Sequence, residues 1–145
     1  PQVLMPYLPG PEYSVDMVVS QGTVLAAIGR RKEGVLQYLE NEGEAIELAI
    51  NCARLMNADG MVNVQTRHNA EGKPLLLEIN MRPSGGIGYT RYSGVNLPGL
   101  YAFHTLGLMD DDQVRQSAKT DFSPAVVRSV TDVILYPASL TNRID

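Results

Sequence analysis

The sequence is poor in the residues that build disulfide frameworks and histidine-based metal sites. Cys52 is its only cysteine, so an internal disulfide framework is excluded, and a single thiol fits a reducing compartment. His68 and His104 are its only histidines, too few to form a histidine-rich zinc site by themselves. We therefore expect a cytoplasmic protein that is stabilised by an ordinary hydrophobic core.

Positive charge and long apolar runs are also scarce. Twelve Lys and Arg residues stand against sixteen Asp and Glu, which gives a net charge of -4 and a pI near 5.1. No basic stripe is present, so a nucleic-acid partner has no electrostatic support. The apolar runs are too short for a membrane-spanning helix, and no signal peptide is recognisable. We expect neither a nucleic-acid nor a membrane partner.

What remains is an ordinary globular composition. Of the 145 residues, 44% are hydrophobic and 19% are charged, and this length is typical of one domain. No repeat, Ser-rich linker or composition break divides the chain, so we expect a single domain over residues 1–145. The chain starts at Pro1 without a methionine and enters an apolar, strand-like run from Val3 to Leu8, which we interpret as the sign of a fragment or a processed product.

Hydrophobic periodicity predicts the elements. Alternation over Glu12–Ser20 and Thr23–Ile28, separated by Gln21-Gly22, predicts a β-hairpin. We interpret residues 30–34 as a charged loop and leave residues 35–40 open between a helical turn and irregular structure. Further elements are predicted from the same patterns: a helix through Ala45–Met56 behind an Asn41/Glu44 capping box, strands at Met61–Arg67 and Pro74–Asn80, a loop at Met81–Gly94, a helix starting at Asn96, a helix start or solvated loop at Asp110–Asp112, and a strand at Val126–Tyr136.

The segment Pro74–Arg82 carries the most informative chemistry. In a strand, residues 76, 78 and 80 share one face, so Glu78 and Asn80 project together at the end of a run too apolar for an exposed strand. If the hairpin closes around residues 69–72, Gln65 lies opposite Leu76 on that same face. Carboxylate and amide oxygens are hard ligands that suit Mg²⁺, which takes further oxygens from substrate phosphates.

The alternative is a hydrogen-bonded strand end without any metal. Arg82 and the glycine-rich loop at residues 84–88 weigh against that alternative, because arginine offers a planar fork to phosphate or carboxylate and glycines allow close backbone approach. From the residues alone, a magnesium–phosphate site is plausible and nothing more specific follows.

Three segments together resemble a known family. The chain contains, in this order, Leu4-Met5-Pro6-Tyr7-Leu8-Pro9-Gly10-Pro11-Glu12-Tyr13-Ser14-Val15-Asp16, a hairpin, a helix, Asn63-Val64-Gln65 and Leu77-Glu78-Ile79-Asn80-Met81-Arg82. This order resembles the C-terminal part of ATP-grasp enzymes. The nearest likeness is to carbamoyl-phosphate-synthase-like ligases and amino-acid ligases, and it covers about residues 2–107. It implies an α+β fold, a mainly antiparallel sheet with helices packed on it, as the C-terminal lobe of an ATP-grasp domain.

The resemblance also implies roles for individual residues. Glu78 and Asn80, with Gln65, would hold Mg²⁺ (or Mn²⁺) between the phosphates of ATP, and Arg82 would contact the transferred phosphate. Glu12 would bind the ribose hydroxyls. The adenine would meet the segment that contains Met5, Tyr7 and Leu8, and a substrate loop would comprise Ser84, Gly85 and Gly86.

The activity implied is that of an ATP- and Mg-dependent carboxylate–amine ligase that works through an acyl-phosphate. Its partners would be ATP, a small-molecule carboxylate and an amine, and homo-oligomer formation stays open. Such enzymes need an upstream lobe with a phosphate-binding lysine and a glycine-rich flap, so we expect this fragment alone to be inactive. Two alternatives are a non-catalytic nucleotide-binding or scaffold module derived from ATP-grasp, and a formyl- or phosphate-forming ATP-grasp enzyme.

Three further groups of residues allow a functional interpretation. The run Arg30-Arg31-Lys32 could face an anionic substrate, although a solvated loop is the commoner fate of such a charge run. For Asp16, on the Glu12 face of its strand, a structural hydrogen bond is favoured over a catalytic role. Tyr89 and Arg91 in the long loop could reach a substrate.

Overall fold

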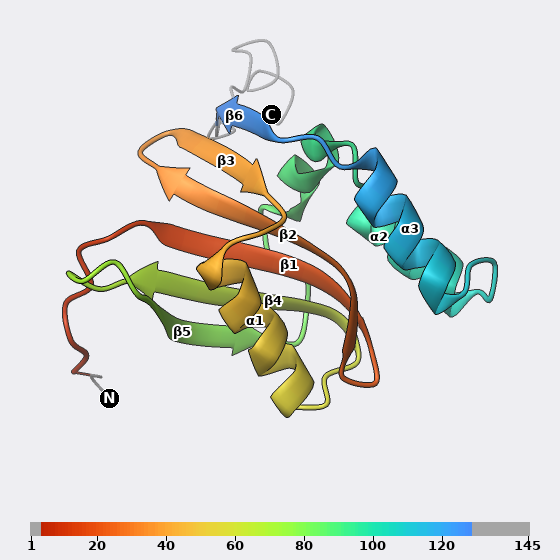
Figure 1. Cartoon of the computed structure of the whole chain (residues 1–145), viewed down its shortest axis with the longest axis horizontal. Coiled ribbons are helices and arrows are strands. Elements are labelled where there is room, and N and C mark those ends of the chain that lie inside the picture. Colours follow the sequence, from red (N-terminus) through yellow and green to blue (C-terminus); the bar gives the residue numbers. More distant parts are fainter. Residues whose placement is uncertain (1–3, 129–145) are drawn as a thin grey trace, which may run out of the picture.

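A computed structural model describes residues 4–128 and shows an α+β fold built on one antiparallel sheet (Figure 1). The six strands in the described part lie in the order β5-β4-β1-β2-β3-β6. Their bounds are β1 Glu12–Ser20, β2 Thr23–Glu33, β3 Leu36–Glu40, β4 Gly60–His68, β5 Pro74–Asn80 and β6 Ala125–Arg128. The helices are α1 Glu44–Leu55, the 3₁₀ helix η1 Ile87–Ser93, α2 Leu97–Thr105 and α3 Asp111–Asp121. The predicted fold class is confirmed.

The β1–β2 hairpin forms at the predicted turn. Gln21 and Gly22 both have positive φ, 45° and 78°, as in the type I′ turn whose twist matches that of the flanking strands. The turn is also tied to the segment between α1 and β4, because the Gly22 amide donates to the Ala58 carbonyl (2.7 Å) and the Gln21 amide donates to Asp59 Oδ1 (3.0 Å). The hairpin is therefore fixed from outside as well as by its own sequence.

The second strand is longer than predicted. The charged segment expected to be a loop belongs to β2, which continues to Glu33 and pairs with β3 from Gly29 to Glu33. Residues 36–40, left open between two other conformations, form β3, because β2 and β6 pair with them on either side. The N-terminal run from Val3 to Leu8, which looks strand-like in the sequence, forms no strand in its described part, residues 4–8.

Two of the three predicted helix starts agree with the structure. At α2 the Asn96 side chain accepts the Gly99 amide, and at α3 Asp110 and Gln113 form a capping box, so the acidic run is a helix start. α1 begins instead after Gly43, whose φ is 116° and which supplies no side-chain cap, so the capping box predicted at Asn41 is wrong. The loop predicted at residues 81–94 contains η1.

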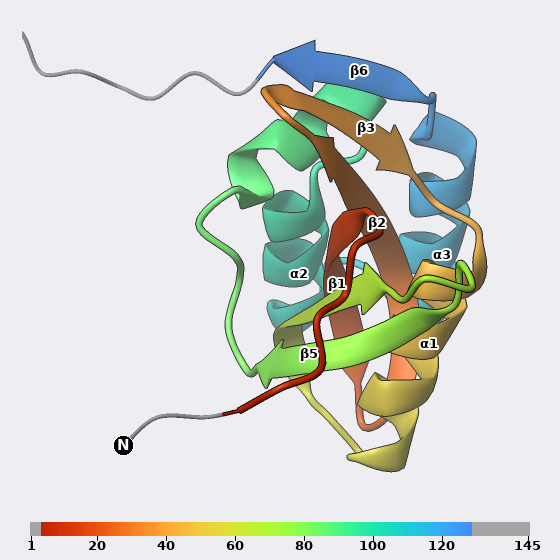
Figure 2. The same ribbon diagram turned by 90° about the vertical axis from the view of Figure 1, so that its left-hand side faces the viewer.

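Two hydrophobic cores lie on opposite faces of the sheet, with α1 on one face and α2 on the other (Figure 2). Odd-numbered residues of β1 such as Val15 and Met17 pack with Ile46 of α1. Val18, on the opposite face, packs with Leu97 of α2 and with the second core. Alternation along one strand therefore supplies both cores.

The edge strand β5 is more exposed than its sequence predicts. Leu75 and Leu76 are 42% and 43% exposed, so the expectation that this apolar run is covered is wrong within the described structure. At the other edge, β6 ends at Arg128, and the rest of the strand predicted over 126–136 lies outside the described residues. Among residues 4–128 no helix is long and apolar enough to cross a membrane.

A polar cluster on the α1 side joins β1, β2 and β3. The Tyr13 hydroxyl donates to Glu40 Oε2 (3.0 Å), and Arg31 Nε donates to Glu40 Oε1 (2.9 Å) while its guanidinium lies 4.1 Å from the centre of the Tyr38 ring. Burial and, next, the hydrogen bond to Glu40 raise the pKa of Tyr13 to about 12.

The first prediction concerns the α1 core. Ile46 is 1% exposed, so Ile46→Ala should lower the free energy of unfolding by about 2–5 kcal/mol, from lost burial and the cavity it leaves. Urea unfolding followed by circular dichroism measures this. The exposed neighbour Glu47 provides the control, Glu47→Gln, and equal losses in both variants would contradict the assigned packing.

The second prediction is a pH dependence. Because the pKa of Tyr13 is raised above its unfolded value near 10, its contribution to stability is present below about pH 10 and is lost as the pH rises through about 12. In a tyrosinate absorbance titration, wild type minus Tyr13→Phe should show one tyrosine ionising near pH 12. A difference curve centred near 10 would refute the Tyr13–Glu40 interaction.

Candidate functional site

Beyond the end covered by α2, the face of the sheet opposite α1 is polar. Alternation and register place its side chains in rows across the strands: Asn80, Asn63 and Asp16 form one row, Glu78, Gln65, Ser14 and Arg30 a second, and Arg67, Glu12 and Lys32 a third. We call this set the polar face. Because adjacent strands are about 4.8 Å apart, each row brings its polar groups within reach of one another.

The three predicted metal ligands meet on the polar face. Glu78 Oε1 accepts hydrogen bonds from Gln65 Nε2 (2.8 Å) and Asn80 Nδ2 (2.9 Å). The predicted register is wrong in detail, because Gln65 lies opposite Glu78 and a shift after Gln65 places Leu76 opposite Thr66. That shift is a β-bulge, in which one extra residue of β5 interrupts the alternation.

The donor set fits a hard cation that keeps water and phosphate ligands. Glu78 supplies one exposed carboxylate, and the two amides could add oxygens once they rotate away from the geometry in which their NH₂ groups face Glu78. Mg²⁺ is commonly held by one or two carboxylates together with substrate phosphates. Within residues 4–128 no group of three or more His, Cys, Asp or Glu side chains could hold a metal, so a site built only from such residues is absent there.

A buried guanidinium lies beside these ligands. Arg30 is 3% exposed; its Nη1 donates to Gln37 Oε1 (2.7 Å), and its Nη2 donates to Ser14 Oγ (2.8 Å) and Ser84 Oγ (2.7 Å). It also forms an ion pair with buried Asp16 (3.3 Å). For Arg30 the solvated-loop interpretation is therefore wrong.

Asp16 connects this cation to the glycine-rich loop. Its Oδ1 accepts the Ser84 amide (2.9 Å) and its Oδ2 accepts the Ser84 hydroxyl (2.7 Å). A Cβ built on Gly86 would lie 2.4 Å from Arg30 Nη1, so only glycine lets the loop lie this close to the guanidinium. The structural role predicted for Asp16 is confirmed. Ser84 anchors the loop, and a substrate-facing role for Gly85 and Gly86 stays a prediction.

Glu12 and the segment before it lie at the start of β1. The Glu12 carboxylate is partly buried and forms an ion pair with Lys32 of β2. The main chain is attached nearby, since Arg67 Nε donates to the Gly10 carbonyl (3.1 Å) and the Gly10 amide donates to the His68 carbonyl (3.0 Å).

The side chains predicted to adjoin the adenine are mostly exposed. Met5 is 53% and Tyr7 85% exposed, and Leu8 is half-buried. Arg82 is exposed as well, and its Nη1 donates to the Pro83 carbonyl (3.0 Å). No hydrogen bond among the described residues joins Arg82 to Glu78 or Asn80, so the structure assembles the three proposed metal ligands without it.

The loop after Arg82 also forms a small pocket. It has a volume of about 280 Å³ and is lined by Gly85, Gly86, Gly88, Tyr89, Arg91 and Tyr92. Arg91 Nη2 donates to the Tyr92 hydroxyl (3.1 Å), and this hydrogen bond is the main cause that raises the pKa of Arg91. The pocket therefore combines an exposed, permanently charged guanidinium with glycine backbone that leaves room for close approach.

The sequence assigns no site role to three polar residues of this region, Ser14, Gln37 and Asn63, although Ser14 and Asn63 belong to segments that carry the family resemblance. Asn63 Nδ2 donates to Ser14 Oγ (3.0 Å) and to the Val15 carbonyl (3.2 Å), and Gln37 accepts from Arg30. The local signal for each was only a polar residue inside an apolar strand, which gains meaning once the strand register is known.

The third prediction tests the buried pair. Asp16→Ala leaves the Arg30 cation buried without its counter-charge and should cost about 3–5 kcal/mol in the free energy of unfolding. Ser84→Ala removes one hydroxyl and should cost about 1–3 kcal/mol. Hydrogen exchange of loop 84–88 should accelerate in both variants. Asp112→Ala, on the exposed side of α3, serves as control; a loss from Asp16→Ala no larger than this control would contradict the network.

A model of a known protein family matches most of the chain. Residues 1–133 match the family described as "ATP-grasp in the biosynthetic pathway with Ter operon". No curated protein sequence is significantly similar to the chain.

Three solved structures share the fold at low sequence identity. An L-amino acid ligase from Bacillus licheniformis has a TM-score of 0.51 at 20% identity, and the match covers 69% of this chain and 29% of that one. The ATP-grasp ligase PsnB with a minimal precursor has a TM-score of 0.50 at 15% identity, with 71% and 36% of the two chains covered. The ADP-bound biotin carboxylase domain of a thermophilic 2-oxoglutarate carboxylase has a TM-score of 0.50 at 17% identity, with 70% and 26% covered. The chain thus spans only about a third or less of each matched structure's length.

The match over residues 1–133, which carries both the Glu12 and the Glu78–Arg82 segments, shows that the chain belongs to this ATP-grasp family.

Proposed function

We propose that this chain supplies the metal- and ribose-binding side of an ATP- and Mg²⁺-dependent carboxylate–amine ligase. The observation that carries the proposal is the meeting of Gln65, Glu78 and Asn80 on one sheet face, with two hydrogen bonds converging on a single Glu78 oxygen. The ATP-grasp family membership and the ligase fold of the structural neighbours support the same class of enzyme.

Glu78, Asn80 and Gln65 are the residues proposed to hold the metal. The Glu78 carboxylate provides the negative charge, and the amide oxygens complete the protein's share of the coordination. A magnesium ion bound there would neutralise charge on the nucleotide phosphates during phosphoryl transfer. Arg82, exposed beside this group, is proposed to swing its guanidinium from the Pro83 carbonyl to the transferred phosphate, where a planar fork suits two phosphate oxygens.

Glu12 and the preceding segment are proposed to bind the nucleoside. The Glu12 carboxylate has two oxygens, and its ion pair with Lys32 uses Oε1, so Oε2 can accept a ribose hydroxyl. The backbone of residues 5–8, which forms no regular secondary structure, is proposed to bind the adenine edge, and exposed Met5 and Tyr7 would then adjoin the base.

The glycine-rich loop is proposed to receive the substrate. The Asp16–Arg30 pair holds Ser84 in place, and the pocket beside Gly85 and Gly86 contains the exposed Arg91 guanidinium. A carboxylate bound by Arg91 would lie on the loop that directly follows the metal ligands in the chain. In the proposed reaction, this carboxylate would take the γ-phosphoryl group of ATP to form an acyl-phosphate, with release of ADP, and an amine would then attack the acyl carbon and displace inorganic phosphate.

A ligase active site needs more than this chain provides. The chain spans 29%, 36% and 26% of the three structures compared above. We therefore infer that it is the C-terminal lobe of an ATP-grasp domain, and that a second lobe contributes a phosphate-binding lysine and a glycine-rich flap. The fragment alone is expected to turn over little or no ATP, and appreciable ADP release from it would refute this division.

A non-catalytic nucleotide-binding module remains the second candidate. It is less well supported, because a site freed from catalysis could lose Glu78, Asn80 and Arg82, and all three are present. A formyl- or phosphate-forming ATP-grasp enzyme would use the same residues, so only product analysis distinguishes it from an amide-forming ligase.

The fourth prediction addresses the metal site in the full-length protein. Glu78→Gln keeps the shape of the side chain but removes the proposed charged ligand, so the apparent Mg²⁺ affinity in the presence of ADP should fall at least about tenfold, equivalent to about 1.4 kcal/mol. Calorimetric ADP binding at increasing Mg²⁺ measures it, and Asn80→Ala should show a smaller loss. Glu71→Gln, in the exposed turn of the same hairpin, is the matched control; identical Mg²⁺ curves for Glu78→Gln and Glu71→Gln would contradict the assignment.

A further inference from the structure

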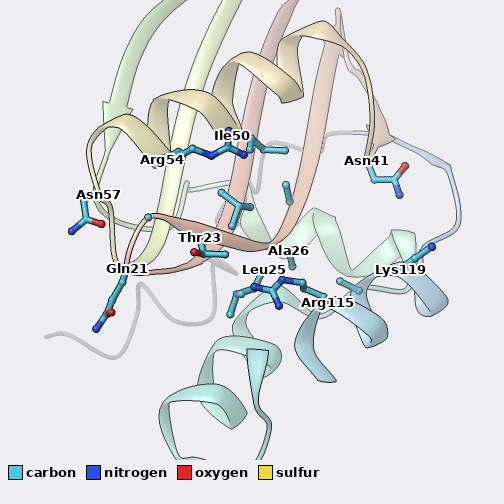
Figure 3. Close-up of a pocket in the computed structure, with 14 residues that line it drawn as sticks. Gln21, Thr23, Leu25, Ala26, Asn41, Ile50, Arg54, Asn57, Arg115 and Lys119 are labelled. Carbon is cyan, nitrogen blue, oxygen red and sulfur yellow. The ribbon is translucent and has the colours of Figure 1, made fainter. Parts of the chain in front are cut away.

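A groove lies along the first half of β2, between α1 and α3 (Figure 3). Its volume is about 530 Å³, within the range of ligand-binding sites. Five consecutive residues of β2, Thr23–Ala27, line it. Because side chains of a strand alternate between faces, an unbroken run of lining residues means that the main-chain edge of β2 borders the groove together with its side chains. It shares no lining residue with the polar face or with the pocket at Arg91.

The edge of β2 is open along this groove. β3 pairs with β2 only over Gly29–Glu33 and then turns away at Asn41 toward α1. Within the described chain, Thr23–Ile28 therefore has β1 as its only strand neighbour. The backbone of this stretch forms no hydrogen bond with α1 or α3 among residues 4–128. An unpaired strand edge is a template for an added strand.

The groove is also basic. Figure 3 shows Arg54 of α1 and Arg115 of α3 on opposite sides of the strand, and Lys119 belongs to the same lining. Arg115 is paired with Asp111 and Asp112, whereas Arg54 and Lys119 have no ion pair with any described residue. No carboxylate lines the groove within residues 4–128, in a chain whose net charge is -4.

Apolar surface and a rigid frame complete the groove. Ile50 and Ala118 contribute apolar side chains from the two helices. At one end, the Gln21-Gly22 turn is held by the hydrogen bonds to Ala58 and Asp59. A site that is already formed loses little ordering entropy when a ligand binds. Proteins often cover an open edge with a helix, but the helices here leave space beside the strand.

We propose that this groove binds an acidic peptide segment in extended conformation, which adds to the edge of β2 where β3 turns away. Main-chain hydrogen bonds to residues 23–27 would supply part of the affinity, as in other strand additions. Acidic side chains on the two faces of the segment would meet Arg54 on the α1 side and Lys119 on the α3 side, and an apolar side chain on the α1 face would contact Ile50. Five extended residues span about 17 Å, the length of strand that the groove exposes.

The test uses a fluorescein-labelled peptide of about nine residues in which pairs of Glu or Asp alternate with pairs of Val or Thr, so that both faces of the extended segment carry acidic and apolar side chains. Fluorescence anisotropy with the full-length protein should show saturable binding that weakens with added salt. A peptide in which Lys replaces every acidic residue should not bind. Equal binding of the two peptides, or none by the acidic one, would overturn the proposal.

Two variants test the location. Arg54→Glu combined with Lys119→Glu should weaken the acidic peptide at least about tenfold, because like charges then face each other. Lys73→Glu combined with Arg128→Glu makes the same change in net charge at two exposed residues that do not line the groove, and it should leave the affinity within about twofold. Equal loss in both would show a general charge effect and would overturn the assignment to the groove. Circular dichroism checks that each variant is folded.

Two further measurements separate strand addition from binding of a small anion. Peptide binding should slow exchange of those amides in residues 23–27 that point away from β1. Two peptides are N-methylated at the two alternate sets of residues, and one of them should lose most of its affinity, because an added strand hydrogen-bonds to the edge through every second residue. Citrate and inorganic phosphate serve as small-anion probes. Full competition by citrate at equal concentration, or undiminished binding of both N-methylated peptides, would overturn strand addition. None of these measurements depends on ATP, so they stand or fall independently of the proposed ligase chemistry.

Discussion

The buried Arg30 guanidinium is the constraint around which this structure is arranged. A cation at 3% exposure is tolerated only when acceptors surround it. Here they come from β1, from β3 and from a loop more than fifty residues later in the chain: Ser14 and Asp16, Gln37, and Ser84. Satisfying one charge therefore fixes how three strands align and where the glycine-rich loop starts. The loop's position relative to the proposed metal ligands depends on this charge.

One sheet performs two tasks because its strands change character along their length. On the face opposite α1, β1 presents Val18 to the second core near its end and Ser14 and Asp16 near its start. The helices α2 and α3 cover only the apolar part. The polar part keeps an open side with Glu78 and Arg82 exposed, which is what the proposed binding of phosphate and metal would require. The hydrophobic cores and the proposed binding surface thus occupy different parts of the same strands.

Local features were predictable from the sequence, and features that depend on distant partners were not. The Gln21-Gly22 turn and the Asn96 cap act over a few residues, and both formed as predicted. Alternation placed Glu78 and Asn80 on one face, but the residue opposite Gln65 depended on an extra residue that periodicity cannot reveal. Arg30 looked like part of a solvated run because its partners lie on other elements: Ser84 comes 54 residues later, and Gln37, seven residues later, comes near it only through the pairing of β3 with β2. Residues 36–40 became a strand only through pairing on both sides. Assigning roles to the site residues rested on family resemblance.

The bulge in β5 has an evolutionary consequence. Between the β4–β5 turn and the Gln65–Glu78 pair, the register already contains one unmatched residue. Side chains in a strand alternate with a period of two, so in a regular hairpin a one-residue insertion or deletion would turn Glu78 and Asn80 to the opposite face. A strand that contains a bulge can gain or lose that residue near the bulge and keep the pairing beyond it unchanged. Members of this family can therefore differ in length across this hairpin while the proposed magnesium ligands keep their orientation.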